Sequence, residues 1–574
     1  MDLLYIWCFL LLSCLVIGQD PVANLPQGRV VGIQVFTENS LKPIEVFYGI
    51  PYAAPPIGRL RFSPPERHTG WRRTLFAHRT PPRCPHAGNE SDFSEDCLYL
   101  NIWTPRRVDG NLLPVIIILY SDSWFKNGVN LPCQELAAEG LVVITVSYRL
   151  HILAFFTLKS IAARGNLSLL DQYMALIWVR ENIATFGGDP NSITLAGHSA
   201  GADSVLLHMV SPRSIGLFNR AIIMSPQYIW KAIEIDNVSE NFNLEKISRS
   251  IAESLGCLSD RESEILQCLK GQSLTSLLSQ YTNNWTDVIH PIPDNFLPET
   301  DQFLPISVSA ALAWTKSPNI PINVLIGITD LESINYDFSF EDVIRHGVDY
   351  LYNQTISTVI PNLLSLLSLD RLETSSLLSQ IIQWEFLGPK MRRENEKQIL
   401  NTLEAIARME TSSKWESGCA LLAARLARRI SHLYVYHYSH IGDIDLYGRR
   451  FNLTGAMHGS ELIALFGDPL MLQIARRPMS QSEKEISIKF RKYIKNFVAF
   501  GSPGSQKEWP RYVVGDSYMH EICDPELMDY NQFKFNKRIS FWLQYLPRIT
   551  NKLALNVQAE KITANNGNHL FYDF

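Results

Sequence analysis

A serine between two glycines stands at a strand-to-helix junction of the sequence. The pentapeptide GHSAG at residues 197–201 follows the apolar run Ile193–Ala196 and precedes the helix-prone segment Val205–Val210. In this position a Gly-x-Ser-x-Gly pattern predicts a nucleophile elbow, in which the glycines permit a close turn and the serine hydroxyl stands at the carboxyl end of a sheet. The pentapeptide alone is common by chance. Its neighbours in the sequence favour Ser199 as the nucleophile of an acyl transfer.

Two further motifs supply that context. Residues 186–190 read FGGDP and lead directly into the elbow, and residues 94–101 read SEDCLYLN. They resemble, residue for residue, the two signature patterns of type-B carboxylesterases, a family that includes cholinesterases, juvenile hormone esterases and neuroligins. The resemblance extends over nearly the whole chain, from about residue 28 to residue 547. It implies an α/β-hydrolase fold and, for the enzymes of the family, serine esterase chemistry without a metal or other cofactor.

A serine nucleophile needs a base, and the base needs an acid that orients it. In this fold the three follow one another as serine, acid and histidine. The segment GITDLE at residues 327–332 follows a predicted strand, and the resemblance places the acid at Glu332, with Asp330 as the rival carboxylate. In the segment GAMHGSE, His458 matches the base of the family. We therefore expect a triad of Ser199, Glu332 and His458.

The loop that should form the oxyanion hole departs from the family pattern. Family enzymes carry a glycine run after the strand that is here Val115–Leu119, and its N–H groups hold the developing negative charge together with the N–H after the serine. This chain has Ser121, Asp122 and Ser123 in that run. Their Cβ atoms disfavour the positive-φ conformations that glycine accepts. Only the backbone N–H of Ala200 remains as an expected donor, unless the loop rearranges and supplies donors of its own.

Other glycines of the family pattern are replaced close to this loop. The resemblance places glycine where the chain has His151, Ala154, Ser168 and Pro226. These replacements gather around the catalytic face, whereas the strand motifs are kept. The pattern indicates a relaxed catalytic constraint.

The elements that position these residues follow from hydrophobic runs. Continuous apolar character, typical of strands buried on both faces, alternates with helical stretches such as the stripe of Leu170, Met174 and Ile177. This alternation predicts an α/β fold, with a large, mostly parallel central sheet flanked by helices. We expect residues 19–574 to form one domain, with a helical insertion from about Ile251 to Trp384. The predicted strands are Val115–Leu119, Leu141–Val146, Ile193–Ala196, Asn323–Ile326 and Leu433–Tyr438.

The amino terminus and the composition indicate export. Leu3–Ile17 is almost wholly apolar, and Gly18 precedes a polar pair, as at a signal-peptide cleavage site. We expect residues 1–18 to be a signal peptide and the mature protein to be secreted and extracellular; a signal anchor is the alternative, but the run is short for a bilayer span. No later segment is uncharged over a length that would cross a membrane. The net charge of −5 gives no basic footprint for nucleic acid.

Cysteines and glycosylation acceptors agree with this route. Of the nine cysteines, two (Cys8 and Cys14) lie in the predicted signal, so seven remain and at least one is unpaired or bonded between chains. The resemblance implies the bridges Cys84–Cys97 and Cys257–Cys268, suggests Cys419 with Cys523 as a substitute third bridge, and leaves Cys133 as a buried thiol. Six Asn-x-Ser/Thr triplets mark acceptors for N-glycosylation, namely Asn89, Asn166, Asn237, Asn284, Asn353 and Asn452.

Three functions remain open on the sequence. The first is a serine hydrolase of small carboxylic esters, weak or specialised because the oxyanion glycines are replaced. The second is a catalytically silent, neuroligin-like protein that binds an extracellular protein partner. The third is a carrier of an apolar ligand. The cholinesterases that this chain resembles carry an aromatic choline anchor inside the loop closed by their first disulfide. The segment between Cys84 and Cys97 holds no tryptophan to face a quaternary ammonium group, so acetylcholine is a poor candidate substrate.

Overall fold

The computed structural model describes most of the chain after residue 19. The described residues are 20–37, 40–86, 93–106, 110–226, 244–280, 290–307, 310, 321–335, 340–370, 374–387, 396–450, 453–514, 519–523 and 537–552. The predicted signal peptide, residues 1–18, lies outside them. No helix in these segments is both long and apolar enough to span a bilayer.

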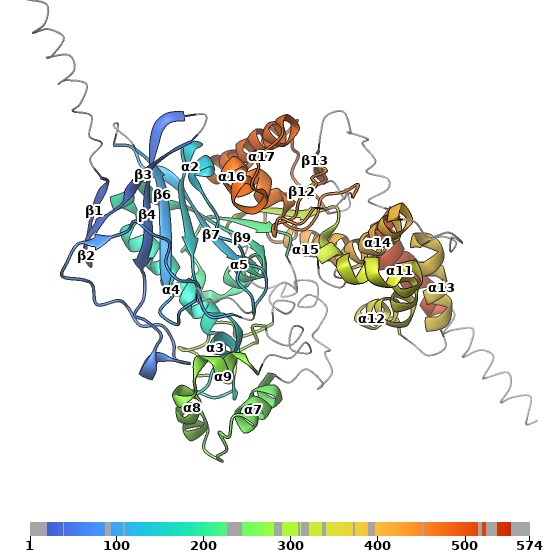
Figure 1. Cartoon of the computed structure of the whole chain (residues 1–574), viewed down its shortest axis with the longest axis horizontal. Coiled ribbons are helices and arrows are strands. Elements are labelled where there is room, and N and C mark those ends of the chain that lie inside the picture. The colour runs from blue at the N-terminus through green and yellow to red at the C-terminus, as the bar shows by residue number, and fades with distance from the viewer. Residues whose placement is uncertain are drawn as a thin grey trace, which may run out of the picture.

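A ten-stranded sheet forms the centre of the molecule (Figure 1). From β13 to β8 each strand runs parallel to its neighbour, whereas β6, β4 and β3 add antiparallel pairs at one edge. The five predicted strands and the mostly parallel sheet are confirmed. In spatial order the strands are β13 (His520–Ile522), β12 (Leu433–Tyr438), β11 (Asn323–Thr329), β10 (Arg220–Met224), β9 (Gly188–Ser199), β7 (Leu113–Ser121), β8 (Val142–Val146), β6 (Tyr99–Pro105), β4 (Ser40–Pro51) and β3 (Ile33–Thr37).

Helices cover both faces of this sheet. Along β7, Ile117 packs into one hydrophobic core and its neighbour Ile116 into the other, because successive side chains of a strand point to opposite faces. The first core is closed by α4 (Leu167–Asn182), α5 (Ala200–Val210) and α15 (Ser417–Leu426). The second is closed by α2 (Gln134–Ala138), α16 (Ser460–Ala475) and α17 (Gln481–Phe500). Burial on both faces explains the continuous apolar strands.

Smaller elements complete the described chain around this core. A separate three-stranded sheet joins β1, β2 and β5 near the amino terminus. The remaining elements of this part are β1 (Val22–Leu25), β2 (Gly28–Val31), β5 (Leu75–Phe76), α3 (His151–Phe155) and the short turns η1 (Gly58–Leu60), η2 (Ile183–Phe186) and η3 (Pro212–Ser214).

The predicted single helical insertion is wrong in its extent. Strand β11 divides it, because the apolar run Asn323–Thr329 is buried between β10 and β12. In Figure 1 the helices before β11 lie apart from those after it. The first group holds α7 (Leu244–Ser254), α8 (Glu262–Gly271) and α9 (Leu274–Leu278). The second holds η6 (Glu332–Asn335), α11 (Phe340–Gln354), η7 (Thr355–Val359), α12 (Ile360–Leu366), α13 (Ser375–Phe386), α14 (Glu396–Glu410), η8 (Thr411–Glu416) and the late segment η10 (Phe541–Tyr545).

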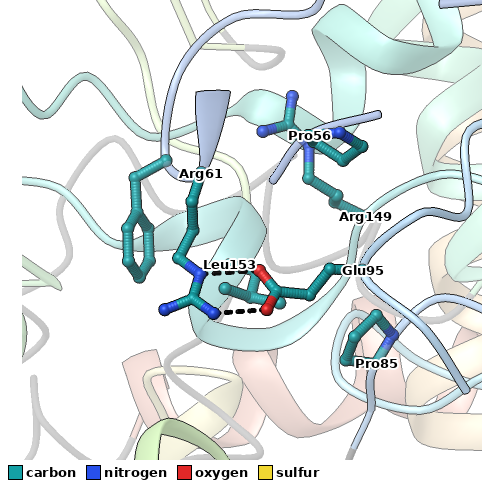
Figure 2. A pocket seen from close by; sticks show the side chains of 7 residues that line it. Pro56, Arg61, Pro85, Glu95, Arg149 and Leu153 are labelled. Atoms are coloured by element: carbon teal, nitrogen blue, oxygen red, sulfur yellow. Dashed lines mark hydrogen bonds and ion pairs between the residues drawn. The ribbon is translucent and has the colours of Figure 1, made fainter. Parts of the chain in front are cut away.

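The acidic part of the SEDCLYLN motif has a structural role. The carboxylate of Glu95 forms a two-point ion pair with Arg61, whose Nε donates to Glu95 Oε2 at 2.7 Å (Figure 2). Arg61 also donates through Nη1 to the backbone oxygen of Gln272, 2.6 Å away. Bidentate arginine–carboxylate geometry is both strong and directional. The ion pair thereby joins the first helical group, at Gln272, to the segment between strands β4 and β6 of the sheet.

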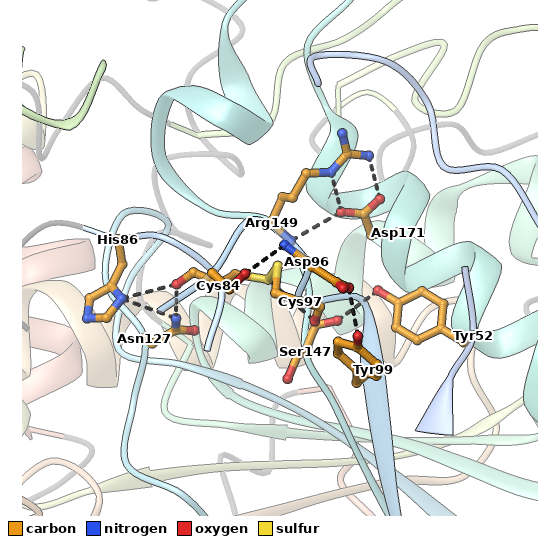
Figure 3. Close-up of a disulfide and its surroundings, with 11 residues drawn as sticks. Tyr52, Cys84, His86, Asp96, Cys97, Tyr99, Asn127, Ser147, Arg149 and Asp171 are labelled. Carbon is orange, nitrogen blue, oxygen red and sulfur yellow. Dashed lines mark hydrogen bonds and ion pairs between the residues drawn. A yellow bond between two sulfur atoms is a disulfide. The ribbon is translucent and has the colours of Figure 1, made fainter. Parts of the chain in front are cut away.

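Two of the three expected disulfides are formed. Cys84 is bonded to Cys97 with a Cα–Cα separation of 5.0 Å (Figure 3), and Cys257 to Cys268 with 5.6 Å. The suggested bridge between Cys419 and Cys523 is wrong, because both are buried thiols. Cys419 lies on α15, which packs against β11 and β12, whereas Cys523 follows the edge strand β13.

The remaining thiol, Cys133, is fully buried, and burial raises its pKa well above the ordinary value. A thiol held in its neutral form is a poor nucleophile, in line with the expectation of a buried, unreactive group.

Two of the six glycosylation acceptors lie within the described residues. Asn353 is exposed on α11. Asn166 is 1% exposed, and its amide donates to the backbone oxygen of Ile292 at 2.7 Å while its carbonyl accepts from the Ile292 N–H at 3.0 Å. A side-chain amide with both ends bonded in the interior has no room for a glycan, so the expectation is wrong for Asn166. The other acceptors, Asn89, Asn237, Asn284 and Asn452, lie outside the described residues.

Candidate active site

The elbow serine occupies a strained turn between β9 and α5. Ser199 has φ 57° and ψ −125°, a backbone conformation that residues other than glycine rarely adopt. The flanking glycines make this turn possible. A Cβ atom on Gly201 would lie 2.0 Å from the backbone oxygen of Leu119, and one on Gly197 would lie 2.1 Å from the oxygen of Gly201. Helix α5 therefore packs directly on β7 and places Ser199 at the carboxyl end of the sheet.

The acid and the histidine arrive from two other strand ends. Leu331 pairs with Met457 in an isolated parallel bridge, so the residues that follow each of them, Glu332 and His458, come together. His458 Nδ1 is hydrogen-bonded to Glu332 Oε2, and Oε1 of the same carboxylate accepts from the Thr329 N–H at 2.7 Å. Both side chains are buried. The buried carboxylate fixes the orientation of the ring.

This pairing also affects the protonation of His458. Burial, the largest single influence, lowers the pKa of His458. The charge and hydrogen bond of Glu332, with the charges of Glu461 and Asp122, outweigh it, so the pKa lies above the ordinary value. A carboxylate beside an imidazole stabilises the protonated ring, which is the form produced when the ring accepts a proton from a serine.

The rival carboxylate, Asp330, is engaged elsewhere. Its two oxygens accept from Arg408 Nη1 at 3.0 and 2.9 Å. Of the two acids weighed on the sequence, the structure brings Glu332 to His458.

The loop after β7 presents an acceptor to the serine. Ser199 Oγ donates a hydrogen bond to the backbone oxygen of Asp122 at 3.0 Å. The N–H on the other side of this peptide, that of Ser123, donates to the backbone oxygen of Lys126 at 3.2 Å. Ser121 is directly opposite Ser199 in the register of β7 and β9, and its hydroxyl lies 3.0 Å from that of Tyr148. The N–H of Ser123 is therefore already bonded within its own loop.

Similarity to known proteins places this arrangement in context. The profile described as "Carboxylesterase family" matches residues 19–542. The chain belongs to the carboxylesterase family. Pyrethroid hydrolase Ces2e of Rattus norvegicus is 30% identical over 95% of this chain and 93% of its own length. Pyrethroid hydrolase Ces2a of Mus musculus is 29% identical over 92% and 93%. Neuroligin-2 of Mus musculus is 28% identical, over 92% of this chain and 68% of the relative.

The altered loop of this carboxylesterase-family chain is held at several points. Lys126 Nζ lies 3.5 Å from the Asp122 carboxylate and 3.1 Å from the hydroxyl of Tyr447. Asn127 donates to the backbone oxygen of Cys84 at 2.7 Å, which joins the loop to the first disulfide (Figure 3). Burial raises the pKa of Asp122, against the lowering effect of Lys126, His458 and His198. These contacts hold the loop in a defined conformation.

His151, at a position where the family pattern has glycine, keeps a backbone conformation that favours glycine. His151 is fully buried and has φ 58°, the left-handed conformation that favours glycine, and its N–H donates to the backbone oxygen of Trp124 at 2.9 Å. A left-handed conformation costs an L-residue about 1–2 kcal/mol. The chain keeps this backbone although the residue has changed, because the hydrogen bond to the loop requires it.

A carboxylate and an imidazole that the sequence had not assigned also belong to this site. His198 precedes the serine, and its ring centroid lies 4.6 Å from that of His458. Its Nε2 is 3.5 Å from Oε1 of Glu461, which stands three residues after His458 at the start of α16. The closeness of Glu461 to His458 in the sequence was the signal available for this carboxylate.

A second cluster of titratable groups lies near the ends of β11 and β12. Among the described residues, Asp330, Glu416 and His437 are the group whose ligand atoms could meet at one metal ion. Arg408 is bonded to Asp330, and Arg538 Nε donates to Glu416 at 2.9 Å. Both carboxylates are thus already matched by guanidinium groups, so the cluster forms a network of ion pairs.

Proposed function

We propose that this protein is a secreted carboxylic ester hydrolase of low turnover. Ser199 is the nucleophile, His458 the general base and Glu332 the acid that orients it. The observation that carries the proposal is the buried hydrogen bond between Glu332 and His458 next to the strained elbow of Ser199. The esterase relatives support the same chemistry. The substrate is a small carboxylic ester, and neither a metal nor another cofactor takes part.

Each step moves one proton through His458. The Ser199 hydroxyl proton passes to His458 Nε2 while Oγ bonds to the ester carbonyl carbon, and the carbonyl oxygen becomes an oxyanion. Collapse of this intermediate breaks the bond to the alcohol oxygen, which takes the proton from His458 and leaves as the alcohol. Water repeats the sequence on the acyl-serine and releases the carboxylic acid. Glu332 stabilises the imidazolium in both halves of the reaction.

The loop after β7 limits this reaction at the oxyanion. Ala200 N–H, at the start of α5, can donate to the developing charge. The carbonyl of Asp122 faces Ser199, and the N–H of Ser123 is bonded to Lys126. Loss of one oxyanion donor lowers kcat by roughly 100- to 1000-fold. We therefore expect slow turnover of simple esters, although Ser199, His458 and Glu332 are all present.

The backbone carbonyl of Asp122, which accepts from Ser199, also favours a second candidate function. A serine hydroxyl that is bonded to a backbone acceptor, beside a loop in which the Ser123 N–H is already bonded, suits a chain whose role is to bind rather than to cleave. The neuroligin-2 relatives support an extracellular protein as the partner in that case.

We further propose export through the secretory route. Residues 1–18 act as a signal peptide, residues 19–574 form a single domain, and the exposed Asn353 carries a glycan. Two formed disulfides support an oxidising compartment.

A fluorophosphonate probe separates the two functions. The probe forms a covalent bond to an activated serine, so the hydrolase should be labelled slowly and in a pH-dependent way, and the Ser199→Ala variant should not be labelled at all. Absence of labelling in the native protein over hours, across a pH series that extends well above neutral, would contradict the hydrolase and favour the binding protein.

A further inference from the structure

Behind the proposed base lies a second imidazole with its own carboxylate. His198 and His458 stack with ring centroids 4.6 Å apart and an interplanar angle of 44°. Glu332 is bonded to His458, and Glu461 faces His198, with 3.5 Å between Nε2 and Oε1. The two rings and their two carboxylates come from three places in the chain, since His458 and Glu461 belong to one segment, and all four side chains are buried.

The carboxylate of Glu461 requires a positive partner. It has no exposed surface, and its Oε1 accepts a hydrogen bond from the Ser225 hydroxyl, while Oε2 has no hydrogen-bond partner among the described residues. Burial raises the pKa of Glu461, but the hydrogen bond from Ser225 and the charges of His198 and His458 bring it below the ordinary value. A buried, ionised carboxylate is stable only when it is paired. The imidazole ring of His198, whose Nε2 lies 3.5 Å from Glu461 Oε1, and the ring of His458 beside it are the groups that can become positive next to this carboxylate.

We infer that His198 is a positioning residue for His458: paired with Glu461, it supports the ring of the base and neutralises the second carboxylate beside it. This inference rests on the proposed function, because it concerns the base of that same site. Without His198, the charge of Glu461 would act on His458 undivided and would hold the proton on its ring. Without Glu461, a protonated His198 would repel the imidazolium form of His458. The pair therefore decides in which pH range His458 is neutral and able to accept the proton of Ser199.

The other charged and titratable groups around the two rings are few. From the loop after β7, the carboxylate of Asp122 acts on both rings, and it is itself paired with Lys126. The ring of Tyr120 meets that of His198 edge to face, at 5.7 Å. From β12, Tyr436 lies near Glu461 and Glu332, and burial raises its pKa so that it stays neutral. None of these groups can replace the cation that Glu461 needs.

The test is the protonation midpoint of His458 in the folded, full-length secreted protein. Histidine labelled with ¹³C at Cε1 reports this midpoint by NMR titration, and the His458→Gln variant identifies the signal. His198→Gln should move the midpoint to higher pH, Glu461→Gln should move it to lower pH, each by on the order of one unit, and the double variant should return it close to the native value. Labelling of Ser199 by the fluorophosphonate should follow the same shifts, because only neutral His458 can accept its proton.

Opposite shifts of the His458 midpoint in the two single variants, which cancel in the double variant, support the pairing of His198 with Glu461. Unchanged midpoints in both single variants, or shifts in the same direction, overturn it, since loss of packing has no reason to act with opposite sign. If Glu461→Gln does not fold, Ser225→Ala serves instead: it removes the hydrogen bond that stabilises ionised Glu461 and should produce a smaller shift to lower pH. The NMR midpoint does not depend on a reactive serine, so failure of the proposed hydrolase function is seen separately, as absent labelling.

Discussion

The hydroxyl of Ser199 donates to the backbone oxygen of Asp122 across 3.0 Å. In an acyl transfer this side of the serine has to receive a developing negative charge, and a carbonyl oxygen there repels it. The peptide between Asp122 and Ser123 is oriented with its oxygen toward Ser199, because its N–H donates to the backbone oxygen of Lys126. It links the altered residues of the loop to a specific step of the reaction.

Rebuilding this loop should restore turnover. The combined change Ser121→Gly, Asp122→Gly and Ser123→Gly gives the backbone the freedom to turn its N–H groups toward the serine, and kcat on p-nitrophenyl butyrate should rise by about 100-fold for each donor recovered, with little change in KM. The same rebuilt protein with Ser199→Ala should be inactive. Turnover of short acyl esters by the native protein at ordinary esterase rates would contradict the role given to the loop.

Substitution of the two rival acids should have different effects. Glu332→Gln removes the charge bonded to His458, so the rate of Ser199 labelling should fall by about 10²- to 10⁴-fold. Since Glu332 raises the pKa of His458, the pH at which the remaining labelling is half-maximal should move down. Asp330→Asn is the matched control, because its carboxylate is bonded to Arg408, and its labelling rate should stay within a few fold of native. The reverse ranking of the two variants would assign the acid to Asp330.

The contact between the elbow and β7 can be tested by stability. Gly201→Ala places a Cβ atom 2.0 Å from the backbone oxygen of Leu119, and neither partner is a flexible side chain that can move away. We expect a loss of about 3 kcal/mol or more, measured by chemical denaturation. Gly271→Ala, at the end of α8 with no atom within 4 Å of the added Cβ, should change stability by less than about 1 kcal/mol. Equal effects of the two substitutions would mean that α5 can shift away from the strand.

Burial separates two of the glycosylation acceptors. The secreted protein should lose the mass of one glycan when Asn353 is changed to Gln, because that side chain is exposed. Asn166→Gln should leave the glycan mass unchanged and lower the stability, because both ends of the Asn166 amide are bonded to Ile292. Intact-mass spectrometry with and without enzymatic deglycosylation measures both. A glycan found on Asn166 would show that the segment is open during or after export.

Much of the fold follows from local patterns that the sequence displays directly. Continuous apolar runs predict strands such as Asn323–Ile326, because residues buried on both faces of a sheet are mostly apolar. The two glycines around Ser199 predict the elbow, because a side chain in either place would collide with the backbone. The resemblance to carboxylesterases added Glu332 and His458, and it also gave two bridges that the structure forms. The strands and the elbow depend on residue type and short spacing alone, whereas the acid, the base and the bridges came from the resemblance.

Other properties arise only when distant segments meet. The sequence shows that Ser121, Asp122 and Ser123 are not glycines, but the direction of the peptide after Asp122 depends on what its two ends can bond to in the folded chain. Asn166 has the acceptor pattern and is buried, because Ile292 packs against it from another part of the chain. His198 and Glu461 are 263 positions apart in the sequence, and the fold brings His198 Nε2 to within 3.5 Å of Glu461 Oε1. Hydrogen bonding and charge pairing act over a few ångströms, so the sequence supplied the groups of this site and the tertiary structure decided their partners.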